Sequence, residues 1–458
     1  MKQKTRRELL RQAGCGLLGR AAFVSGFDRF SLVSALAAPI APTDYKALVC
    51  IFMFGGNDSN NTVISLDNYT SYANSRGILA LTQAQLAATA INPKSGGHYA
   101  LHPSMTGAAS LFKNGKLSIL ANVGTLTAPI TKAMYVSGAS RPYQLFSHSD
   151  QQSQWQTSVS TTDSPFGWGG RMADQTQDAA TGFPTISSLA GVSIFSAGQV
   201  TQPIALAPAP TPLNNTLNLR HADTAFAPIL GYDSASTTPT LVAAADTITQ
   251  NAVNNSALLN SNPTIATVFP TTGLGNQLLQ VAKLIKLSST LGLKRQIFFC
   301  SIGGFDTHTV QLPTQNALLG QLSDAMTAFY NATVEIGVGS KVTTFTLSDF
   351  ARTFVPAGTA VATVGSDHAW GSHHFIMGDS VLGGDLYGTF PDLVVGGNFD
   401  TDTGTGARGR WIPGTAVDEY ASTLATWYGL TPSDLGLVFP NVANGTFPTS
   451  NLGFMMPS

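Results

Sequence analysis

Four short apolar runs, each as long as a β-strand, constrain the fold of this chain more than any other feature. They cover 46–54, 117–123, 296–302 and 342–347. Because the runs show no strict alternation of polar and apolar residues, they predict strands buried on both faces, as in parallel sheets. Stretches with apolar residues at helical spacing separate or follow them, and these cover 103–113, 274–291, 313–336 and 416–429. We therefore expect an α/β fold, a three-layer sandwich around a mostly parallel central sheet.

Polar motifs follow three of these runs. Asp58 ends a Gly-Gly-Asn-Asp motif after the first run, Asp306 and His308 follow the third, and Asp349 follows the fourth. Ligands of open α/β sheets bind at the carboxyl ends of the strands. We therefore expect these side chains to meet at one edge of the sheet, although they lie far apart in the sequence.

A further dense motif, 367–374, contains His368, His373 and His374. Carboxylates and imidazoles that converge on one edge repel or desolvate one another unless a cation compensates them. The pattern therefore predicts a divalent metal ion, Zn²⁺, Mn²⁺, Mg²⁺ or Ca²⁺. Such an ion can polarise an ester oxygen and lower the pKa of a bound hydroxyl or water.

Each motif also has a structural interpretation. Asp58 could cap a strand-to-helix turn, and Asp306 with His308 could form a hydrogen-bonded pair. Asp349 and Arg352 could form a buried ion pair. The two adjacent histidines of the later motif could be surface groups or could orient other side chains.

A candidate nucleophile lies at Ser147, beside His148, in the segment 146–156. A hydroxyl next to a base or metal is a typical nucleophile, but the same residues could simply begin a polar helix. The segment lacks the Gly-x-Ser-x-Gly pattern of a serine-hydrolase elbow. The Gly-Gly pairs elsewhere form no dinucleotide fingerprint.

The amino terminus resembles a secretory signal. Arg6 and Arg7 precede an apolar stretch at 13–24, and Ala35-Leu36-Ala37 offers a cleavage triplet. Paired arginines are typical of the twin-arginine pathway. We expect export by the twin-arginine translocase and a periplasmic or secreted mature protein. A basic amphipathic helix is the alternative, and no later apolar run approaches the ~20 residues that span a bilayer, so we expect no stable membrane insertion.

Composition excludes one class of partner. Of the 24 Lys and Arg and the 25 Asp and Glu, seven and two lie in 1–37, so the mature chain is acidic. Because nucleic-acid binding depends on phosphate neutralisation, we expect no nucleic-acid partner. Cys50 and Cys300 would remain after cleavage. A disulfide is compatible with the periplasm, but neighbouring buried thiols are the favoured interpretation.

Seven stretches, taken in order, are similar to the twin-arginine-exported family catalogued as domain of unknown function fifteen-oh-one. They are 55–61, 147–155, 167–171, 303–308, 348–353, 365–374 and 409–413. More distantly, the chain resembles the alkaline phosphatase and sulfatase superfamily. That resemblance implies a central sheet flanked by helices, metal ligands at strand ends, and a serine, threonine or modified cysteine nucleophile.

The superfamily pattern assigns roles to individual residues. It implies metal ligation by five side chains and a nucleophilic Ser147; the five are Asp58, Asp306, His308, Asp349 and His368. Two departures put a two-metal site in doubt, because Phe350 follows Asp349 where a histidine is expected, and only one residue separates Asp306 from His308. A single-metal site of sulfatase type, or a lost catalytic function, is then implied, with Arg352 supplying part of the missing positive charge.

The sequence therefore predicts a signal peptide at 1–37 and one α/β domain at 38–458, with 190–272 as an insertion or cap. The predicted function is an exported metal-dependent hydrolase of phosphate or sulfate esters, acting on a small or glycan-linked anionic ester. Ser147 would act beside His148 as a candidate base, and Arg352, His373 and His374 would orient groups or stabilise the anion. The alternative is a non-catalytic exported protein that binds glycans or supports surface assembly on the same scaffold.

Overall fold

The computed structural model describes residues 42, 44–176, 183–215, 258–259, 261–360 and 362–457. The predicted signal peptide lies outside the described residues, and so does most of the predicted insertion at 190–272. Among the described residues, no helix has the length and apolar character needed to cross a membrane.

A nine-stranded mixed sheet forms the centre of the described residues, in the order β11-β5-β10-β9-β1-β8-β6-β7, with β12 paired to β5. The strands are β1 Lys46–Met53, β5 Leu117–Gly124, β6 Ile186–Ser188, β7 Ile204–Ala205, β8 Arg295–Ile302, β9 Val342–Ser348, β10 Ser372–Met377, β11 Leu386–Gly388 and β12 Thr415–Ala416. All pairs are parallel except those of β10, which runs antiparallel to both β5 and β9. The prediction of a mostly parallel sheet is therefore confirmed, and each of the four predicted strands is present.

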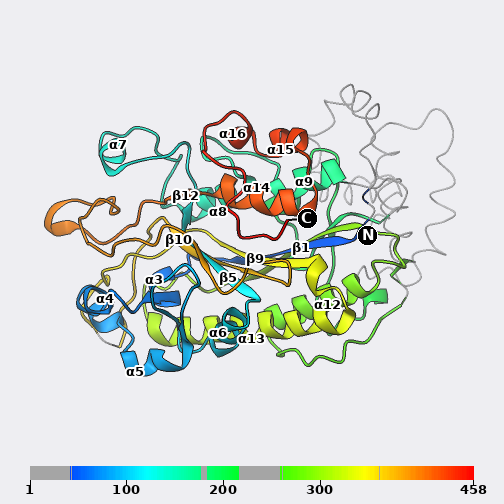
Figure 1. Cartoon of the computed structure of the whole chain (residues 1–458), viewed down its shortest axis with the longest axis horizontal. Coiled ribbons are helices and arrows are strands. Elements are labelled where there is room, and N and C mark those ends of the chain that lie inside the picture. The colour runs from blue at the N-terminus through cyan, green and yellow to red at the C-terminus, as the bar shows by residue number, and fades with distance from the viewer. Residues whose placement is uncertain are drawn as a thin grey trace, which may run out of the picture. The chain divides into compact units, whose positions relative to one another are not determined.

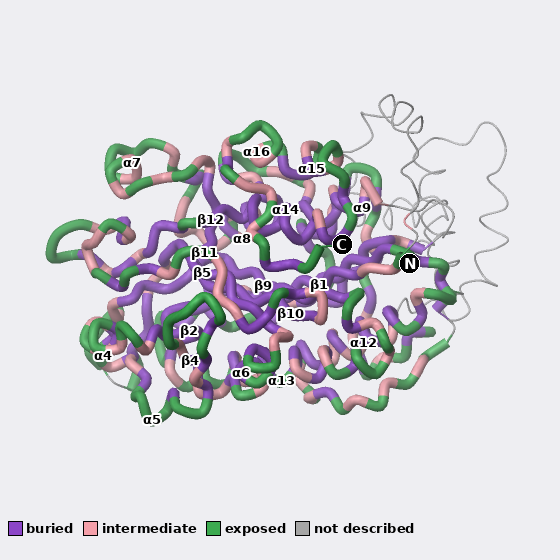
Figure 2. Tube along the Cα trace, viewed as in Figure 1, coloured by how far each residue is buried: buried purple, intermediate pink, exposed green. Residues whose placement is uncertain are grey.

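Helices cover both faces of this sheet (Figure 1). One face carries α6 Thr106–Lys113, α12 Gly273–Lys286 and α13 Gln311–Ile336, and the other carries α8 His148–Thr157, α9 Trp168–Thr176, α14 Val417–Tyr428, α15 Pro432–Val438 and α16 Pro440–Ala443. Strand β1 shows why its sequence is uniformly apolar. Val49 and Ile51 pack on the face that α12 and α13 cover, whereas Leu48 and Phe52 pack on the opposite face, under α14. Figure 2 shows this buried centre.

The same alternation of faces explains where the two cysteines lie. In the parallel register, Cys50 lies beside Phe299 and Cys300 lies beside Ile51. Because neighbouring residues of a strand point to opposite faces, Cys50 packs on one face and Cys300 on the other. Both thiols are free and buried, as the favoured interpretation predicts. Burial raises the pKa of both thiols.

A smaller layer precedes β5 in the chain. It contains a three-stranded antiparallel sheet in the order β2-β4-β3, with β2 Val63–Ser65, β3 Ala90–Ile91 and β4 Tyr99–Leu101. The short helices α3 Ser59–Thr62, α4 Tyr69–Arg76 and α5 Gln83–Leu86 accompany it. After β5 the chain makes an excursion that contains the five-residue helix α7 Lys132–Val136, which has no buried residue, before it enters α8.

Candidate metal centre

The candidate site lies where β1, β5, β8 and β9 end, which we call the carboxyl edge of the sheet. Asp306 and His308 follow β8, and Asp349 is the first residue after β9. His148 is the first residue of α8, and His368 lies in the loop that precedes β10. The predicted convergence of these distant segments is therefore what the fold produces.

One carboxylate oxygen and three imidazole nitrogens form the centre of this cluster. Asp306 Oδ1 lies 3.2 Å from His308 Nε2, 3.4 Å from His148 Nε2 and 3.8 Å from His368 Nε2. His308 Nε2 and His368 Nε2 are 2.9 Å apart. Ligand atoms of His148, Asp306 and His368 all lie within 4.8 Å of one another, which is close enough for them to share a metal ion.

The Nδ1 atom of each imidazole has its own oxygen partner. The pairs are His148 with Asp349 Oδ2 (2.7 Å), His308 with Asp367 Oδ1 (3.2 Å) and His368 with the Phe146 carbonyl (2.8 Å). An Nδ1–H donated to an oxygen leaves the Nε2 lone pair for a metal, and metal-bound histidines are usually held in this way. His148 Nε2 is buried and has no hydrogen-bond partner. The donor set of three nitrogens and one oxygen therefore fits a divalent transition ion such as Zn²⁺.

Charged neighbours set the protonation of the cluster. The hydrogen bond that His148 donates to Asp349 raises the pKa of His148, whereas burial lowers the pKa of His368. Partial burial acts to raise the pKa of Asp306, but the hydrogen bond and charge of Arg352 outweigh it and lower that pKa. Asp306 is therefore ionised at neutral pH, as a metal ligand must be.

Arg352 lies fully buried beneath the cluster. Its guanidinium donates to Asp306, to the Gly55 carbonyl, to Gly56 O at 3.0 Å and to Ser366 O at 3.1 Å. These bonds occupy all three of its nitrogens. Arg352 therefore orients Asp306 and compensates its charge, and it does not present a free guanidinium to an anion.

Asp349 is fully buried and holds three donors from the protein. Gly55 N–H donates to Oδ1 at 3.1 Å, and Gln152 Nε2 donates to Oδ2 at 2.8 Å, beside His148. The sequence predicts Asp349 as a ligand, but the structure places it as the hydrogen-bond partner of the His148 ring. The expected ion pair between Asp349 and Arg352 is replaced by one between Arg352 and Asp306.

Asp58 is engaged elsewhere. It is fully buried, forms an ion pair with Arg76 from α4 and accepts a hydrogen bond from Gln311. Its Oδ1 also accepts Asn60 N–H at 3.1 Å, which makes it the amino-terminal cap of α3. The structure thus gives Asp58 the capping role that the sequence analysis offered as an alternative. It does not bring Asp58 into the group around Asp306.

The adjacent histidines of β10 are also fully enclosed. His373 Nδ1 accepts Asn122 N–H at 3.0 Å, and its ring stacks on Phe390. His374 packs against Trp155 and Tyr420 on the opposite face of the strand. Burial lowers the pKa of each to about 3, so both rings are neutral parts of the core. The structure does not bring them to the cluster.

Ser147 directly precedes His148 in the chain, and Phe350 packs against the cluster. Ser147 is half-buried at the residue before α8, and its hydroxyl donates to Asp150 Oδ2. Phe350 is fully buried, and its ring centroid lies 4.8 Å from that of His148 and 4.6 Å from that of His368. An apolar ring therefore fills the space where the superfamily pattern expects a second histidine.

Three participants were missed by the sequence analysis: Asp367, Gln152 and the Phe146 carbonyl. Asp367 directly precedes His368 in the dense motif, so its position was visible. Gln152 lies four residues after His148, which is one helical turn. The backbone carbonyl of Phe146 has no signal in the sequence.

Comparisons with known proteins agree with the family resemblance. The model of the family described as "Protein of unknown function (DUF1501)" matches residues 45–398. Among curated proteins, none matches the chain. Among solved structures, the lipoteichoic acid synthase LtaP from Listeria monocytogenes matches with a TM-score of 0.33 and 5% identity, covering 90% of this chain and 81% of that one.

Two further structures are similar to the same degree. A protein in the alkaline phosphatase superfamily from Vibrio parahaemolyticus has a TM-score of 0.32 and 9% identity, covering 86% of this chain and 68% of that one. The PsFucS1 sulfatase from Pseudoalteromonas sp. has a TM-score of 0.30 and 9% identity, covering 80% and 67%. Likenesses of this size carry no argument about activity, which therefore has to rest on the geometry of the cluster.

Proposed function

The chain belongs to the DUF1501 family of proteins of unknown function, and we propose that it is an exported metal-dependent hydrolase of phosphate or sulfate esters. One observation carries this proposal. Three imidazoles and one carboxylate converge, each imidazole has its Nδ1 bound to an oxygen, and the buried Nε2 of His148 has no hydrogen-bond partner. An unpartnered buried nitrogen costs free energy unless a ligand satisfies it.

The metal would be held by His148, Asp306, His308 and His368. When bound, it would polarise an ester oxygen and lower the pKa of a coordinated hydroxyl or water. Asp349 and Asp367 fix the rings of His148 and His308 through their Nδ1 atoms. Arg352 fixes Asp306 from below. These outer contacts orient the donor atoms before any ligand arrives, which reduces the reorganisation that binding requires.

Ser147 is the proposed nucleophile. It stands between Phe146, whose carbonyl holds His368, and His148 itself, so its position is fixed on both sides by the cluster. Asp150 accepts the hydrogen bond of the Ser147 hydroxyl and would accept its proton. Ser147 Oγ would bond to phosphorus or sulfur as the bond to the alcohol oxygen breaks, and the leaving alcohol oxygen would take up, through water, the proton that Asp150 accepted. A water would then hydrolyse the covalent intermediate, giving its hydroxyl to phosphorus or sulfur and its proton to Ser147 Oγ.

Export through the twin-arginine pathway is part of the proposal. It is supported by Arg6, Arg7 and the cleavage triplet 35–37, which precede the matched family region. Replacement of both arginines by lysine should trap the precursor in the cytoplasm. Cell fractionation with an antibody would measure this, and full periplasmic recovery of the variant would contradict the assignment.

The proposed function is tested by metal content and ester hydrolysis measured together on the mature protein. We expect a tightly held divalent ion by elemental mass spectrometry and turnover of para-nitrophenyl phosphate or sulfate, both lost in Asp306→Asn/His308→Ala. The matched control is Asp67→Asn/His98→Ala, which removes an exposed Asp–His pair whose atoms lie 2.8 Å apart. Absence of metal after incubation with Zn²⁺, Mn²⁺, Mg²⁺ and Ca²⁺ would refute the proposal.

The second candidate is a non-catalytic exported protein, favoured by the contacts of Asp306. Arg352 already neutralises this carboxylate, and His308 Nε2 and His368 Nε2, 2.9 Å apart, would hydrogen-bond one another if one ring carried a proton on Nε2. The cluster could therefore be a self-contained structural network. Metal-free protein that retains the melting temperature of the metal-loaded form and lacks any turnover would favour this candidate.

A further inference from the structure

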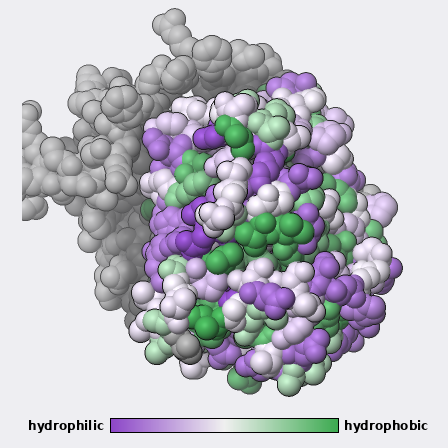
Figure 3. Space-filling view, turned by 90° about the vertical axis from the view of Figure 1, so that its left-hand side faces the viewer, coloured by the Kyte–Doolittle hydropathy of each residue, from purple (hydrophilic) through white to green (hydrophobic). Residues whose placement is uncertain are grey.

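Two of the four side chains of the cluster lie open to solvent. The Asp306 side chain is 52% exposed and that of His308 is 43% exposed. Small-molecule sites instead enclose most of their ligand's surface. Figure 3 shows the side of the molecule that lies on the left in Figure 1, where hydrophobic residues gather near the middle of the face among hydrophilic ones. An ester that reacts here would therefore keep much of its carrier outside the cluster.

A cavity of about 440 Å³ lies at this same edge of the sheet. One wall is 130–133, from the excursion that contains α7, and the other consists of 398–399 and 412–414. Gly414 directly precedes β12, which pairs with Val123 and Gly124 at the carboxyl end of β5. The cavity therefore lies near the carboxyl end of β5, at the edge of the sheet that also carries the cluster.

Both walls of the cavity continue to the cluster. The excursion that begins with the first wall ends at Phe146, whose carbonyl accepts the His368 Nδ1–H. On the other side, Arg410 Nε donates to the His368 carbonyl at 2.9 Å. His368 is thus hydrogen-bonded by both segments that line the cavity, so the same two segments position the cavity walls and one histidine of the cluster.

Hydrogen bonds from Lys132 connect the first wall of the cavity to the opposite segment. Lys132 Nζ donates to three carbonyls of the opposite segment, those of Gly396 at 2.7 Å, Gly397 at 2.9 Å and Asp402 at 2.7 Å. A lysine ammonium with three oxygen partners has no donor left for a ligand. The two walls of the cavity are therefore held in place by contacts within the protein.

The lining of the cavity combines an aromatic ring, an amide and a hydroxyl, in Phe399, Asn398 and Thr131, with the apolar side chains of Ile130 and Pro413. Apolar surface with a few convergent polar groups suits a compact hydroxylated ring. No carboxylate lines it. We propose that this cavity binds a sugar ring of an anionic glycan whose sulfate or phosphate ester is presented to the cluster. This inference rests on the proposed function and names its substrate class.

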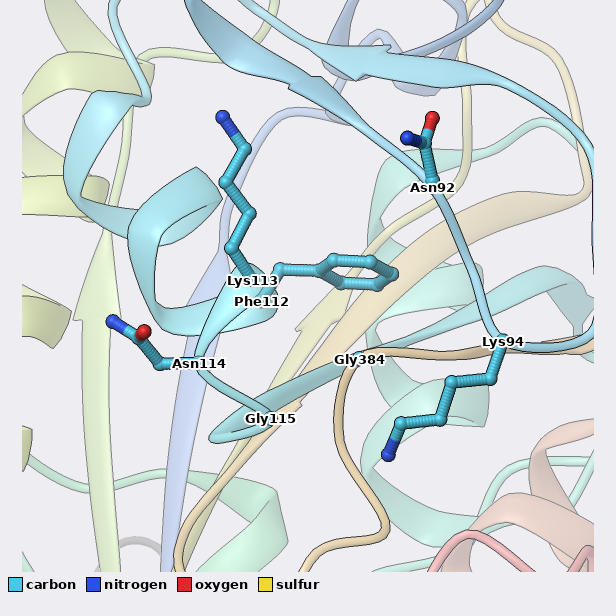
Figure 4. A pocket seen from close by; sticks show the side chains of 7 residues that line it. All are labelled: Asn92, Lys94, Phe112, Lys113, Asn114, Gly115 and Gly384. Carbon is cyan, nitrogen blue, oxygen red and sulfur yellow. The ribbon is translucent and has the colours of Figure 1, made fainter.

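A second cavity, of about 360 Å³, supplies an internal control. It is lined by Asn92, Lys94 and Lys113 among others, and lies at the start of β5, which is the opposite edge of the sheet. Figure 4 shows the two lysine side chains extending in different directions, and Lys94 Nζ donates to Gly383 O at 2.7 Å. Asn92 and Asn398 are both exposed asparagines that line a cavity, one at each edge.

The test is binding of the mature protein to an array of sulfated, phosphorylated and neutral oligosaccharides, followed by calorimetry with the best sulfated or phosphorylated probe. We expect about tenfold weaker binding by Asn398→Ala and by Phe399→Ala, and unchanged binding by Asn92→Ala. Equal binding by Asn398→Ala and wild type, binding to neutral glycans alone, or no glycan binding would overturn the inference.

The same protein samples are assayed with para-nitrophenyl sulfate and phosphate. Turnover of these small esters without glycan binding leaves the proposed function standing and removes the glycan inference. Glycan binding that depends on Asn398, without turnover of any ester, would support a glycan site in the cavity and would count against the proposed hydrolase. The two proposals therefore fail by different measurements.

Discussion

Replacement of Asp349 by asparagine tests whether Asp349 is itself a metal ligand or a residue that orients the ligand His148. In the native protein Oδ2 accepts from His148 and Gln152, and Oδ1 accepts from the Gly55 N–H. An asparagine has a single oxygen. Its NH₂ group must therefore face either the Gly55 N–H or the two side-chain donors, and one donor is left facing another donor.

The structure sets the size of the expected effect. One buried donor without an acceptor costs about 1–3 kcal/mol of the free energy of unfolding. Loss of an outer-shell partner of a metal-bound histidine weakens metal affinity by about 10–100-fold. Asp349→Asn should therefore bind the same number of ions as the wild type, but more weakly. His148→Ala and Asp306→Asn, which remove ligands, should lose far more.

The assay is competition with a chromophoric chelator at constant pH, combined with thermal unfolding before and after chelation. Asp324→Asn, an exposed substitution on α13, controls for the change in net charge. If Asp349→Asn loses metal as completely as Asp306→Asn, Asp349 is itself a ligand, as the superfamily pattern implies. If its affinity equals that of the wild type, the hydrogen bond to His148 has no role in binding.

Three further predictions follow from buried polar groups. Asp58→Asn should lower the free energy of unfolding by about 3–5 kcal/mol, because it leaves the Arg76 guanidinium buried without its partner; urea titration should show this loss while the metal content stays unchanged. Burial raises the pKa of Asp418 to about 7. The stability that its protonated form contributes is present below about pH 4 and is lost as the pH rises through 7, by up to about 4 kcal/mol. Asp418→Asn should remove this dependence in urea titrations at pH 5 and pH 8, and an unchanged pH profile would contradict the assignment. Cys50 and Cys300 should resist a thiol reagent in the native mature protein and react fully in urea; an intact mass that rises on reduction would show a disulfide.

The sequence predicts the layers of this fold well because its strands are buried on both faces. The run 47–53 has no polar position at which a different register or face could be chosen, so its length and composition are sufficient. Strand β10 was not predicted. Its histidines resembled a reactive motif, whereas they fill the core on opposite faces of an antiparallel strand between β5 and β9. Nothing in Ser372–Met377 alone distinguishes a neutral core imidazole from a ligand.

The position of a residue after a strand predicts its edge of the sheet but not the direction of its side chain. Asp306 and Asp58 both follow β-strands, yet one meets three imidazoles and the other meets Arg76. The difference is decided by α4, which delivers the guanidinium to Asp58 from the smaller layer. Such a contact depends on tertiary packing and has no signature in the motif itself.

The charge balance at the carboxyl edge favours one metal ion over two. A second ion needs acidic ligands, but Asp58 is paired with Arg76, and both oxygens of Asp349 hold donors from the protein. Phe350 fills the space beside His148 and His368 with an apolar ring. Elemental analysis should therefore give about one ion per chain, and cobalt substitution should give the intense visible absorption of a four-coordinate centre. Two ions per chain would require Asp58 or Asp349 to abandon these partners, and Asp58→Asn would then lose one ion, which is the opposite of the result expected here.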